Sequence, residues 1–323
     1  MRVAVTGSIA TDHLMSFPGR FTDNLLADSL DTVSLSFLVD DLQVRRGGTA
    51  ANVAAGMARL GVTPLLVGAA GHDFGAYGRW LTGIGVDISG VRLSTRHATA
   101  RFVCTTDVEH NQIASFYAGA MTEAVEIDVT ALGALDLVLI GPNDPAAMLR
   151  YAADCRAAGL PFAADPSQQL ASLTGEQAAD VVTGAAYLTT NEYEAALLLE
   201  RTGWSTAEVL ARVGTWMVTL GARGARIARA GQPAEEVPAV PVPKPVDPTG
   251  AGDAFRAGLL TGLGRGLPLR RGVQLGCALA AYAVESIGTQ DYEADPAGLL
   301  ARFAAAYGAA AAAELAPCLP VTV

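Results

Sequence analysis

The chain of 323 residues is 51% hydrophobic, which excludes a disordered protein and suffices for one large α/β core or two small domains. Its net charge of −10 and isoelectric point near 4.9 exclude a surface that coats nucleic acid or an anionic membrane, so any phosphate group must be bound locally. Lys244 is the one lysine, which excludes the lysine-containing phosphate loop of P-loop NTPases.

The four cysteines lie far apart and form neither a C-x-x-C motif nor a pairing with histidine. For Cys104, Cys155, Cys277 and Cys318 we therefore expect buried free thiols in a reducing compartment. The first residues lack the pattern of a secretory signal, and no apolar run reaches membrane-spanning length. The sequence predicts a cytoplasmic protein.

The N-terminal segment Val3 to Ile9 reads as a buried parallel strand that places Ser8 and Asp12 at its carboxyl end. In open α/β sheets this edge is where ligands bind. Only Gly7 is present where a Rossmann fingerprint needs three glycines, so that class is excluded. A solvated loop acid is the alternative for Asp12.

Strict alternation of apolar residues predicts a strand from Val33 to Val39, with Ser36 on the face opposite Phe37. An exposed strand of this kind leaves a free edge and an apolar face, so we expect a homodimer formed by pairing of two such segments.

The next segment combines Gly47 and Gly48 with Thr49 as a capping residue, before an alanine-rich helix. Backbone exposed at Gly48, with Asn52 one turn further on, suits hydrogen bonds to sugar hydroxyls. The alternative is an ordinary helix start whose asparagine faces solvent.

Strands and helices then alternate, which predicts a parallel sheet with helices on both faces. The expected strands are Leu65 to Ala70, Leu135 to Ile140, Phe162 to Asp165, Tyr187 to Thr190 and Met217 to Leu220; the expected helices are Phe74 to Ile84, Asp144 to Ala158, Tyr193 to Thr202, Leu269 to Glu285 and Ala294 to Ala313.

Two stretches interrupt this alternation, Thr32 to Gln43 and Thr99 to Ala118, and they predict a small antiparallel flap. The second divides into strands Ala100 to Thr106 and Gln112 to Tyr117, which carry Phe102 and Phe116. Such phenylalanines are usually core residues, but on a flap they suit stacking on a purine.

Polar residues follow three of the later strands. Gln168 and Gln169 suit contacts to a base edge or to hydroxyls, and the alternative is a polar loop. Asn191 and Glu194 suit a hydrated Mg²⁺ or, equally, complementation of a helix dipole. Thr219 to Gly224 suits close passage of a nucleotide, although ordinary turn chemistry predicts the same residues.

The segment Asp247 to Phe255 (DPTGAGDAF) reads as an anion site with a base beside it. Gly250 and Gly252 allow close backbone approach, and the amides of Gly250, Ala251, Gly252 and Asp253 at a helix N-terminus suit a phosphate. A carboxylate beside such amides suits a general base that takes a proton from an attacking hydroxyl. The alternative for Asp253 is an acid that stabilises the helix dipole.

The segment Arg46 to Asn52 (RGGTAAN), followed later by Asp247 to Phe255, resembles the paired signatures of the ribokinase-like family of sugar and nucleoside kinases. The resemblance covers nearly the whole chain and is greatest to bacterial adenosine kinases, through Val5 to Met15, Ser34 to Asp41, Ala163 to Gln169 and Glu285 to Gln290. It implies a single domain over residues 1–323, a mostly parallel sheet flanked by helices, and a small β-sheet lid over about residues 12–46 and 95–120.

The resemblance also implies roles for individual residues. Asp253 resembles the base and Gly250 to Gly252 the anion hole; Asp12, Gly48 and Asn52 would hold the ribose. Phe102 and Phe116 would clamp the base of the nucleoside, with Ser8, Ser36, Gln168 and Gln169 around it. Asn191, Thr219, Gly221 and Gly224 resemble the ATP site, Glu194 the acid that organises Mg²⁺, and Asp247 with the Ser286 to Gly288 turn a site for a monovalent cation such as K⁺.

The function implied is adenosine kinase: Asp253 accepts the proton as the ribose 5′-hydroxyl attacks the γ-phosphoryl of Mg·ATP, forming AMP in purine salvage. The alternatives are a kinase of another nucleoside or sugar and a catalytically silent nucleoside-binding regulator. Ser172 stands where close relatives tend to have arginine, and Pro238 to Pro245 is unusually rich in proline, so base preference is less defined than reaction type.

Overall fold

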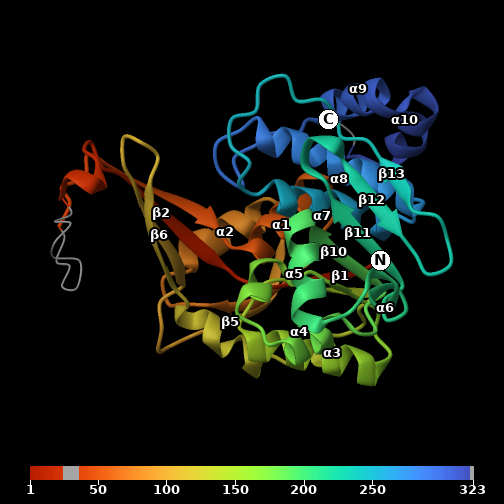
Figure 1. The fold of residues 1–323 in the computed structure, drawn as a ribbon, viewed down its shortest axis with the longest axis horizontal. Coiled ribbons are helices and arrows are strands. Elements are labelled where there is room, and N and C mark those ends of the chain that lie inside the picture. The colour runs from red at the N-terminus through yellow and green to blue at the C-terminus, as the bar shows by residue number, and fades with distance from the viewer. Residues whose placement is uncertain (25–35, 321–323) are drawn as a thin grey trace.

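A nine-stranded sheet forms the centre of the described part of the chain, residues 1–24 and 36–320 of this computed structural model (Figure 1). Its order is β13-β12-β11-β10-β9-β8-β1-β4-β5, parallel except for the last two strands of the chain, which pair antiparallel at one edge. The strands are β1 Val3–Thr6, β4 Leu65–Ala70, β5 Asp87–Leu93, β8 Leu137–Ile140, β9 Phe162–Ala164, β10 Tyr187–Asn191, β11 Thr215–Thr219, β12 Ala225–Ala228 and β13 Glu235–Val237.

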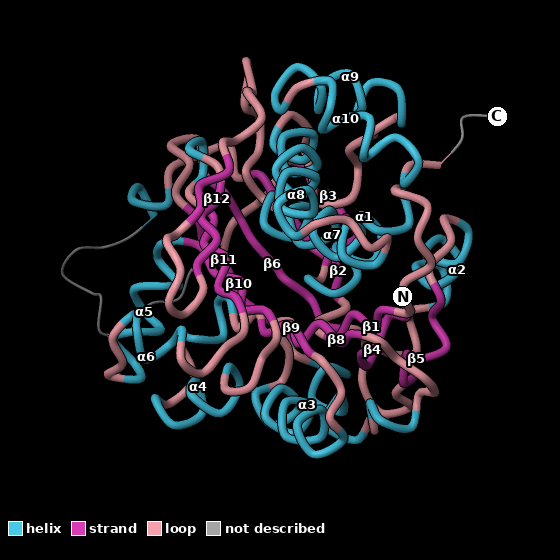
Figure 2. The backbone as a smooth tube through the Cα atoms, turned by 90° about the vertical axis from the view of Figure 1, so that its right-hand side faces the viewer, coloured by secondary structure: helices cyan, strands magenta, loops and turns pink. Residues whose placement is uncertain are grey.

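Helices cover both faces of this sheet, as the parallel strand pattern predicts (Figure 2). One face carries α1 Thr49–Arg59, α2 Gly75–Gly83, α7 Ala251–Gly264, α8 Leu269–Val284, α9 Pro296–Tyr307 and α10 Ala309–Leu315; the other carries α3 Pro145–Ala158, α4 Gly175–Val182, α5 Glu192–Thr202 and α6 Thr206–Leu210. Short 3₁₀ segments are η1 Phe21–Asn24, η3 Gly119–Glu126, η4 Val129–Ala131, η5 Ser167–Ala171, η6 Gly221–Arg223 and η7 Ala316–Cys318.

Strand β1 shows why the central strands form. Val3 and Val5 pack into the core on one face, whereas Ala4 packs into the core on the other. A strand buried on both faces reads as a continuous apolar run. The chain leaves β1 toward β4 and β5 and later returns to β8 on its other side, so the carboxyl ends of β1 and β8 form a topological switch point where ligands bind in such sheets.

A second sheet of order β3-β2-β6-β7 projects from the core and is called the lid sheet below (Figure 1). Its strands are β2 Ala10–Ser16, β3 Asp41–Gly47, β6 Ala100–Thr106 and β7 Gln112–Tyr117. The two later strands agree with the sequence prediction. The sheet is mixed rather than antiparallel, because β2 and β6 pair in parallel.

Two further expectations for the fold, and the alternative given for Asp12, are wrong. Residues 36–39 form no strand and residues 33–35 lie outside the described part; Phe37 instead packs against Phe17 and Phe21, each with ring centroids 4.9 Å away. Asp12 lies within β2 rather than in a loop. The single helix expected over Ala294 to Ala313 is two helices, because Gly308 adopts a φ of 92° between them.

The free thiols are confirmed for all four cysteines, with Cys318 half-buried and the others buried. None of the helices within residues 1–24 and 36–320 is long and apolar enough to cross a membrane.

Candidate active site

Ser8 lies at the switch point and organises the start of α1. Its amide donates to the Pro142 carbonyl at 2.8 Å, and its Oγ accepts a hydrogen bond from the Thr49 amide at 2.9 Å. The expectation that Thr49 caps the helix is therefore wrong: Thr49 is the first helical residue, and the preceding Gly48 makes no side-chain cap. The Ser8 hydroxyl, from the segment between β1 and β2, supplies an acceptor for this amide at the start of the helix.

Gly47 and Gly48 are glycines because other parts of the protein approach them. Gly48 has a φ of 92°, and a Cβ there would lie 2.6 Å from the Ser8 carbonyl oxygen. A Cβ on Gly47 would lie 2.6 Å from Asp12 Oδ2. The sequence predicts that a ligand approaches the backbone at these two glycines. In the structure it is the β1–β2 segment of the protein that lies against them.

Asp253 lies in the first turn of α7 and is held by Asn52 of α1, whose Nδ2 donates to Asp253 Oδ2 at 2.7 Å. Asn52 Oδ1 accepts from Thr289 Oγ1 at 3.0 Å and from Gln290 Nε2 at 2.6 Å. Because both donors bind Oδ1, the amide group of Asn52 must face Asp253. The solvent-facing alternative for Asn52 is wrong, and its side chain holds the candidate base.

Burial sets the protonation of the two acids in this region. It raises the pKa of Asp253, although Arg256 and the Asn52 hydrogen bond oppose the rise. It also raises the pKa of Asp12 to about 6, and the charge of Asp253 adds to that rise. No described residue donates a hydrogen bond to the Asp12 carboxylate. A carboxylate with a raised pKa is a better proton acceptor at neutral pH than an ordinary one.

Some of the backbone amides at the start of α7 have no hydrogen-bond acceptor among the described residues. Gly250 adopts a φ of 80°, and a Cβ there would lie 2.9 Å from Thr289 Cβ. The Ala251 amide donates to the Pro248 carbonyl at 3.2 Å, so this member of the predicted anion hole is engaged. Within the described residues, the amides of Gly250, Gly252 and Asp253 have no acceptor. These three donors remain for an anion.

Two adjoining cavities meet at this turn. The smaller, about 220 Å³, is polar and is lined by Ser167, Asn191, Glu194, Thr219, Gly250, Gly252, Asp253 and Arg256. The larger, about 680 Å³, is mostly apolar and is lined by residues that include Thr219, Gly221, Gly224, Gly252 and five members of the proline-rich 238–245 stretch. Every residue predicted for the ATP site lines one cavity or the other, and Thr219 and Gly252 line both.

Glu194 and Asn191 form a capping box at the start of α5. Glu194 Oε2 accepts from the Asn191 amide and Asn191 Oδ1 accepts from the Glu194 amide, both at 2.7 Å. Glu194 Oε1 accepts from Ser167 Oγ at 3.2 Å. Among the described residues no group of three acidic, histidine or cysteine side chains could hold a metal alone. One carboxylate at a polar cavity fits Mg²⁺, which keeps several waters and binds substrate phosphates.

Arg256 and Asp165 were not singled out by the sequence analysis, and the structure places them beside Asp253. The Arg256 guanidinium forms an ion pair with Asp165, and Asp165 is completely buried. Burial raises the pKa of Asp165 to about 7, against the opposing charge of Arg256. The available signal was an arginine within an otherwise apolar helix, three residues after the candidate base.

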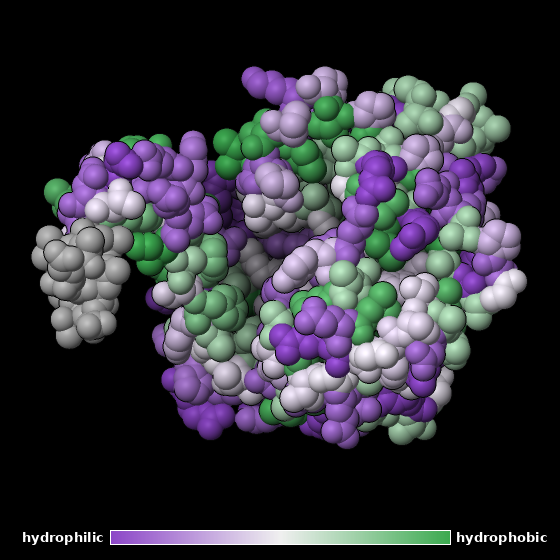
Figure 3. All heavy atoms as spheres, in the orientation of Figure 1, coloured by the Kyte–Doolittle hydropathy of each residue, from purple (hydrophilic) through white to green (hydrophobic). Residues whose placement is uncertain are grey.

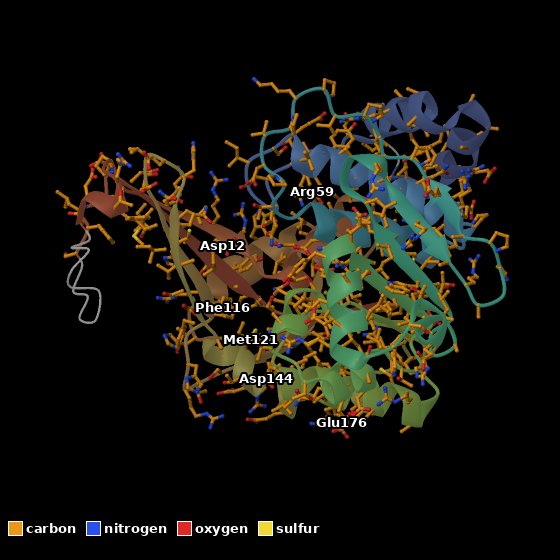
Figure 4. All side chains as sticks on the ribbon, in the orientation of Figure 1. Asp12, Arg59, Phe116, Met121, Asp144 and Glu176 are labelled. Carbon is orange, nitrogen blue, oxygen red and sulfur yellow. The ribbon has the colours of Figure 1, made fainter. Side chains whose placement is uncertain are left out.

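Asp12, Phe102 and Phe116 occupy one face of the lid sheet. Asp12 pairs with Phe102 across β2 and β6, and Phe102 pairs with Phe116 across β6 and β7. The labelled Asp12 and Phe116 lie where the lid sheet meets the core (Figure 4), and the surface is hollowed between the two parts (Figure 3). Phe116 is 51% exposed, so this aromatic pair is not part of a closed core.

The remaining residues predicted to surround the base of the nucleoside do not all lie near the candidate site. Gln169 Nε2 donates to the Asn143 carbonyl at 2.9 Å, which places it near Ser8 at the switch point. Gln168 is exposed. Ser36 lies beyond the far end of β2 from Asp12, since the adjacent Phe37 packs against Phe17, which directly follows β2. The structure therefore does not bring Ser36 to the other candidate residues.

The central parallel sheet, the projecting lid sheet and the glycine-flanked acid at a helix start define a ribokinase-like α/β protein. The chain belongs to the pfkB family of carbohydrate kinases, whose family model matches residues 8–295. This confirms the resemblance inferred from the paired motifs.

Nucleoside kinases are among the most similar known proteins. The chain is 30% identical to one from Methanothermobacter thermautotrophicus over 287 residues, 87% of this chain and 92% of that protein. It is 31% identical to one from Methanocaldococcus jannaschii over 246 residues, 76% and 80% of the two chains. The solved nucleoside kinase of Burkholderia thailandensis in complex with inosine has a TM-score of 0.84 at 33% identity, covering 95% of this chain and 98% of that one.

Proposed function

We propose that this protein is a nucleoside kinase that transfers the γ-phosphoryl group of ATP to the ribose 5′-hydroxyl of adenosine, in purine salvage. The observation that carries the proposal is the half-buried Asp253 beside three free amides at the edge of a polar cavity. Similarity to nucleoside kinases supports a nucleoside as acceptor. Phe102 and Phe116, on the same face as Asp12, support a substrate with a flat base joined to a diol.

The reaction proceeds as an in-line displacement. The 5′-oxygen forms a bond to the γ-phosphorus while the bond from that phosphorus to the β–γ bridging oxygen breaks, and ADP leaves. The proton of the 5′-hydroxyl passes to Asp253, which Asn52 holds in place. The amides of Gly250, Gly252 and Asp253 stabilise the charge on the phosphoryl oxygens. Asp12 binds the ribose hydroxyls. These hydroxyls donate hydrogen bonds to its carboxylate, which has no donor among the described residues of the protein.

Mg²⁺ bound near Glu194 would neutralise charge on the triphosphate, and the Asn191 amide and the Ser167 hydroxyl orient that carboxylate by donating to it. The larger cavity receives the adenosine part of ATP, with Thr219, Gly221 and Gly224 on its wall. In this proposal residues 12–46 and 95–120 form a lid on a single domain, and closure of the lid over the nucleoside excludes water from the transfer.

A substrate panel tests the proposal. Adenosine, inosine, guanosine, cytidine and ribose are each incubated with Mg·ATP, with and without K⁺, and the products are separated by chromatography. We expect AMP from adenosine at the highest rate. Phosphorylation of ribose alone would indicate a sugar kinase, and nucleoside binding without phosphorylation a silent regulator. K⁺ stimulation is expected through Asp247, which accepts from the amides of Thr249 at 2.9 Å and Gly288 at 3.3 Å.

We expect a homodimer that pairs the faces of two lid sheets opposite Asp12. Four apolar side chains on that face are 46–59% exposed: Leu42, Val44, Ile113 and Tyr117. Burial of such a patch in a second copy is favourable. Sedimentation should give a dimer mass, and Val44→Glu should shift it to the monomer. A monomer for the unaltered protein would contradict this expectation.

A further inference from the structure

Charge around the smaller cavity is unbalanced. Asp165 is completely buried, Glu194 is 8% exposed, and Asp253 is half-buried, whereas the basic side chain that lines this cavity is Arg256, 8% exposed. All three carboxylates lie close enough to Arg256 to favour its charged form. Lys244 is exposed on a loop, and Arg223 pairs with the exposed Glu192. Arg256 is therefore the positive side chain available to a ligand in this cavity, among the residues described.

Asp165 holds one edge of the Arg256 guanidinium. Nη2 of Arg256 donates to Asp165 Oδ1, and Nε contacts Oδ2, which is the side-on fork of an arginine–carboxylate pair. The anchor is rigid because Asp165 follows β9 directly and its amide donates to the Ile140 carbonyl at 2.9 Å. Glu194 Oε2 lies 4.0 Å from Nη2, on the same side.

The other edge of the guanidinium faces the start of α7. Nη1 has no hydrogen-bond acceptor within residues 1–24 and 36–320. A Cβ on residue 252 would lie 2.6 Å from Nη1, so glycine is required for the guanidinium to lie against this turn. The free amides of Gly252 and Asp253 line the same cavity. A buried, partly unpaired guanidinium and backbone donors thus converge on one volume.

We propose that Arg256, oriented by Asp165, binds the transferred phosphoryl group through its Nη1 edge, an inference that rests on the kinase function proposed above. Guanidinium groups bind phosphate oxygens through two parallel N–H donors, and their planar fork lets one edge hold a carboxylate while another holds the phosphate. Arg256 then supplies positive charge to the transferred phosphoryl group as the β–γ bridging bond breaks. Asp165 acts through Arg256 and is a positioning residue.

The competing explanation is that the ion pair only fastens α7 to β9. Arg256→Gln distinguishes the two, with kcat from the adenosine assay and separate calorimetric titrations of Mg·ATP and adenosine. We expect kcat to fall by roughly 10- to 100-fold and Mg·ATP affinity by about tenfold, while adenosine affinity stays within about twofold. Asp165→Asn should give a smaller change of the same kind. Arg271→Gln, which removes the ion pair between Arg271 on α8 and Glu314 on α10, should leave all three values unchanged.

Unchanged kcat and Mg·ATP affinity in Arg256→Gln would overturn the proposal, as would equal losses of Mg·ATP and adenosine affinity. If this variant does not fold, Arg256→Lys replaces it, since lysine keeps the charge but cannot hold Asp165 and a phosphate on two edges. Wild-type kcat in Arg256→Lys would then overturn the proposal. Failure to phosphorylate any nucleoside would refute the proposed function. Mg·ATP binding is measured without nucleoside, so the effect of Arg256→Gln on that affinity would still test the role of Arg256.

Discussion

Replacement of Asp253 by asparagine is expected to lower kcat for nucleoside phosphorylation by roughly 10²- to 10⁴-fold, the usual loss when a general base is removed. Asparagine keeps the size of the side chain and can still accept the hydrogen bond from Asn52 Nδ2, so the fold should persist. It cannot accept the proton of the 5′-hydroxyl. Steady-state kinetics with saturating nucleoside and Mg·ATP measure the effect.

The pH dependence of the unaltered enzyme's activity gives a second test of Asp253 as the general base. Because burial raises the pKa of Asp253, activity should decline as pH falls toward that raised value, at higher pH than an ordinary carboxyl would require. The Asp253→Asn variant should lose this acidic limb. Asp180→Asn, on the exposed side of α4, is the matched control and should retain full turnover. Wild-type turnover in Asp253→Asn would discard Asp253 as the base.

The central strands and the two glycine motifs could be predicted because their signals are local. Strands such as β4 are buried on both faces and read as continuous apolar runs, and the motif around Gly250 combines a left-handed glycine with an acid in the first helical turn. Strand β2 could not be recognised, because its sequence ATDHLMS is largely polar and its residues are mostly half-buried.

The side-chain partners in the candidate site depend on contacts between distant parts of the chain. Asn52 is oriented by Thr289 and Gln290, which lie far along the sequence, so its direction toward Asp253 could not be derived from the helix that carries it. The pairing of Arg256 with Asp165 likewise joins a helix to the end of a strand that precedes it by several elements. Residue types indicated the chemistry, and the sheet topology determined which residues meet.

Replacement of Asp12 by asparagine is expected to weaken nucleoside binding and, in the ligand-free protein, to increase stability. In the proposed site the carboxylate accepts hydrogen bonds from two ribose hydroxyls. Hydrogen bonds to a charged group contribute about 1.5–3 kcal/mol each, so the affinity should fall by roughly 100-fold or more. Calorimetric titration of adenosine measures this loss, and Mg·ATP affinity should not change.

The stability gain follows from the raised pKa of Asp12. Between its ordinary pKa of 3.8 and its folded value of about 6, the native state binds more protons than the unfolded state, so the free energy of unfolding falls as pH rises through this window. Above the window the buried charge is unfavourable by at most roughly 3 kcal/mol. Asp12→Asn should therefore unfold at higher urea concentration than the unaltered protein at pH 7.5, with the difference lost near pH 4.

Asp73→Asn is a control variant for which the expected change in the free energy of unfolding has the opposite sign. Hydrogen bonds from Thr99 and Arg101 outweigh burial and lower the pKa of Asp73 to about 2, so its charge stabilises the fold above its ordinary pKa and that contribution is lost as pH falls. Asp73→Asn should lower stability at pH 7.5 and leave adenosine affinity unchanged. If Asp12→Asn destabilised the ligand-free protein at pH 7.5, or bound adenosine normally, Asp12 would be a structural acid of the lid sheet rather than a group kept unpaired for the ribose.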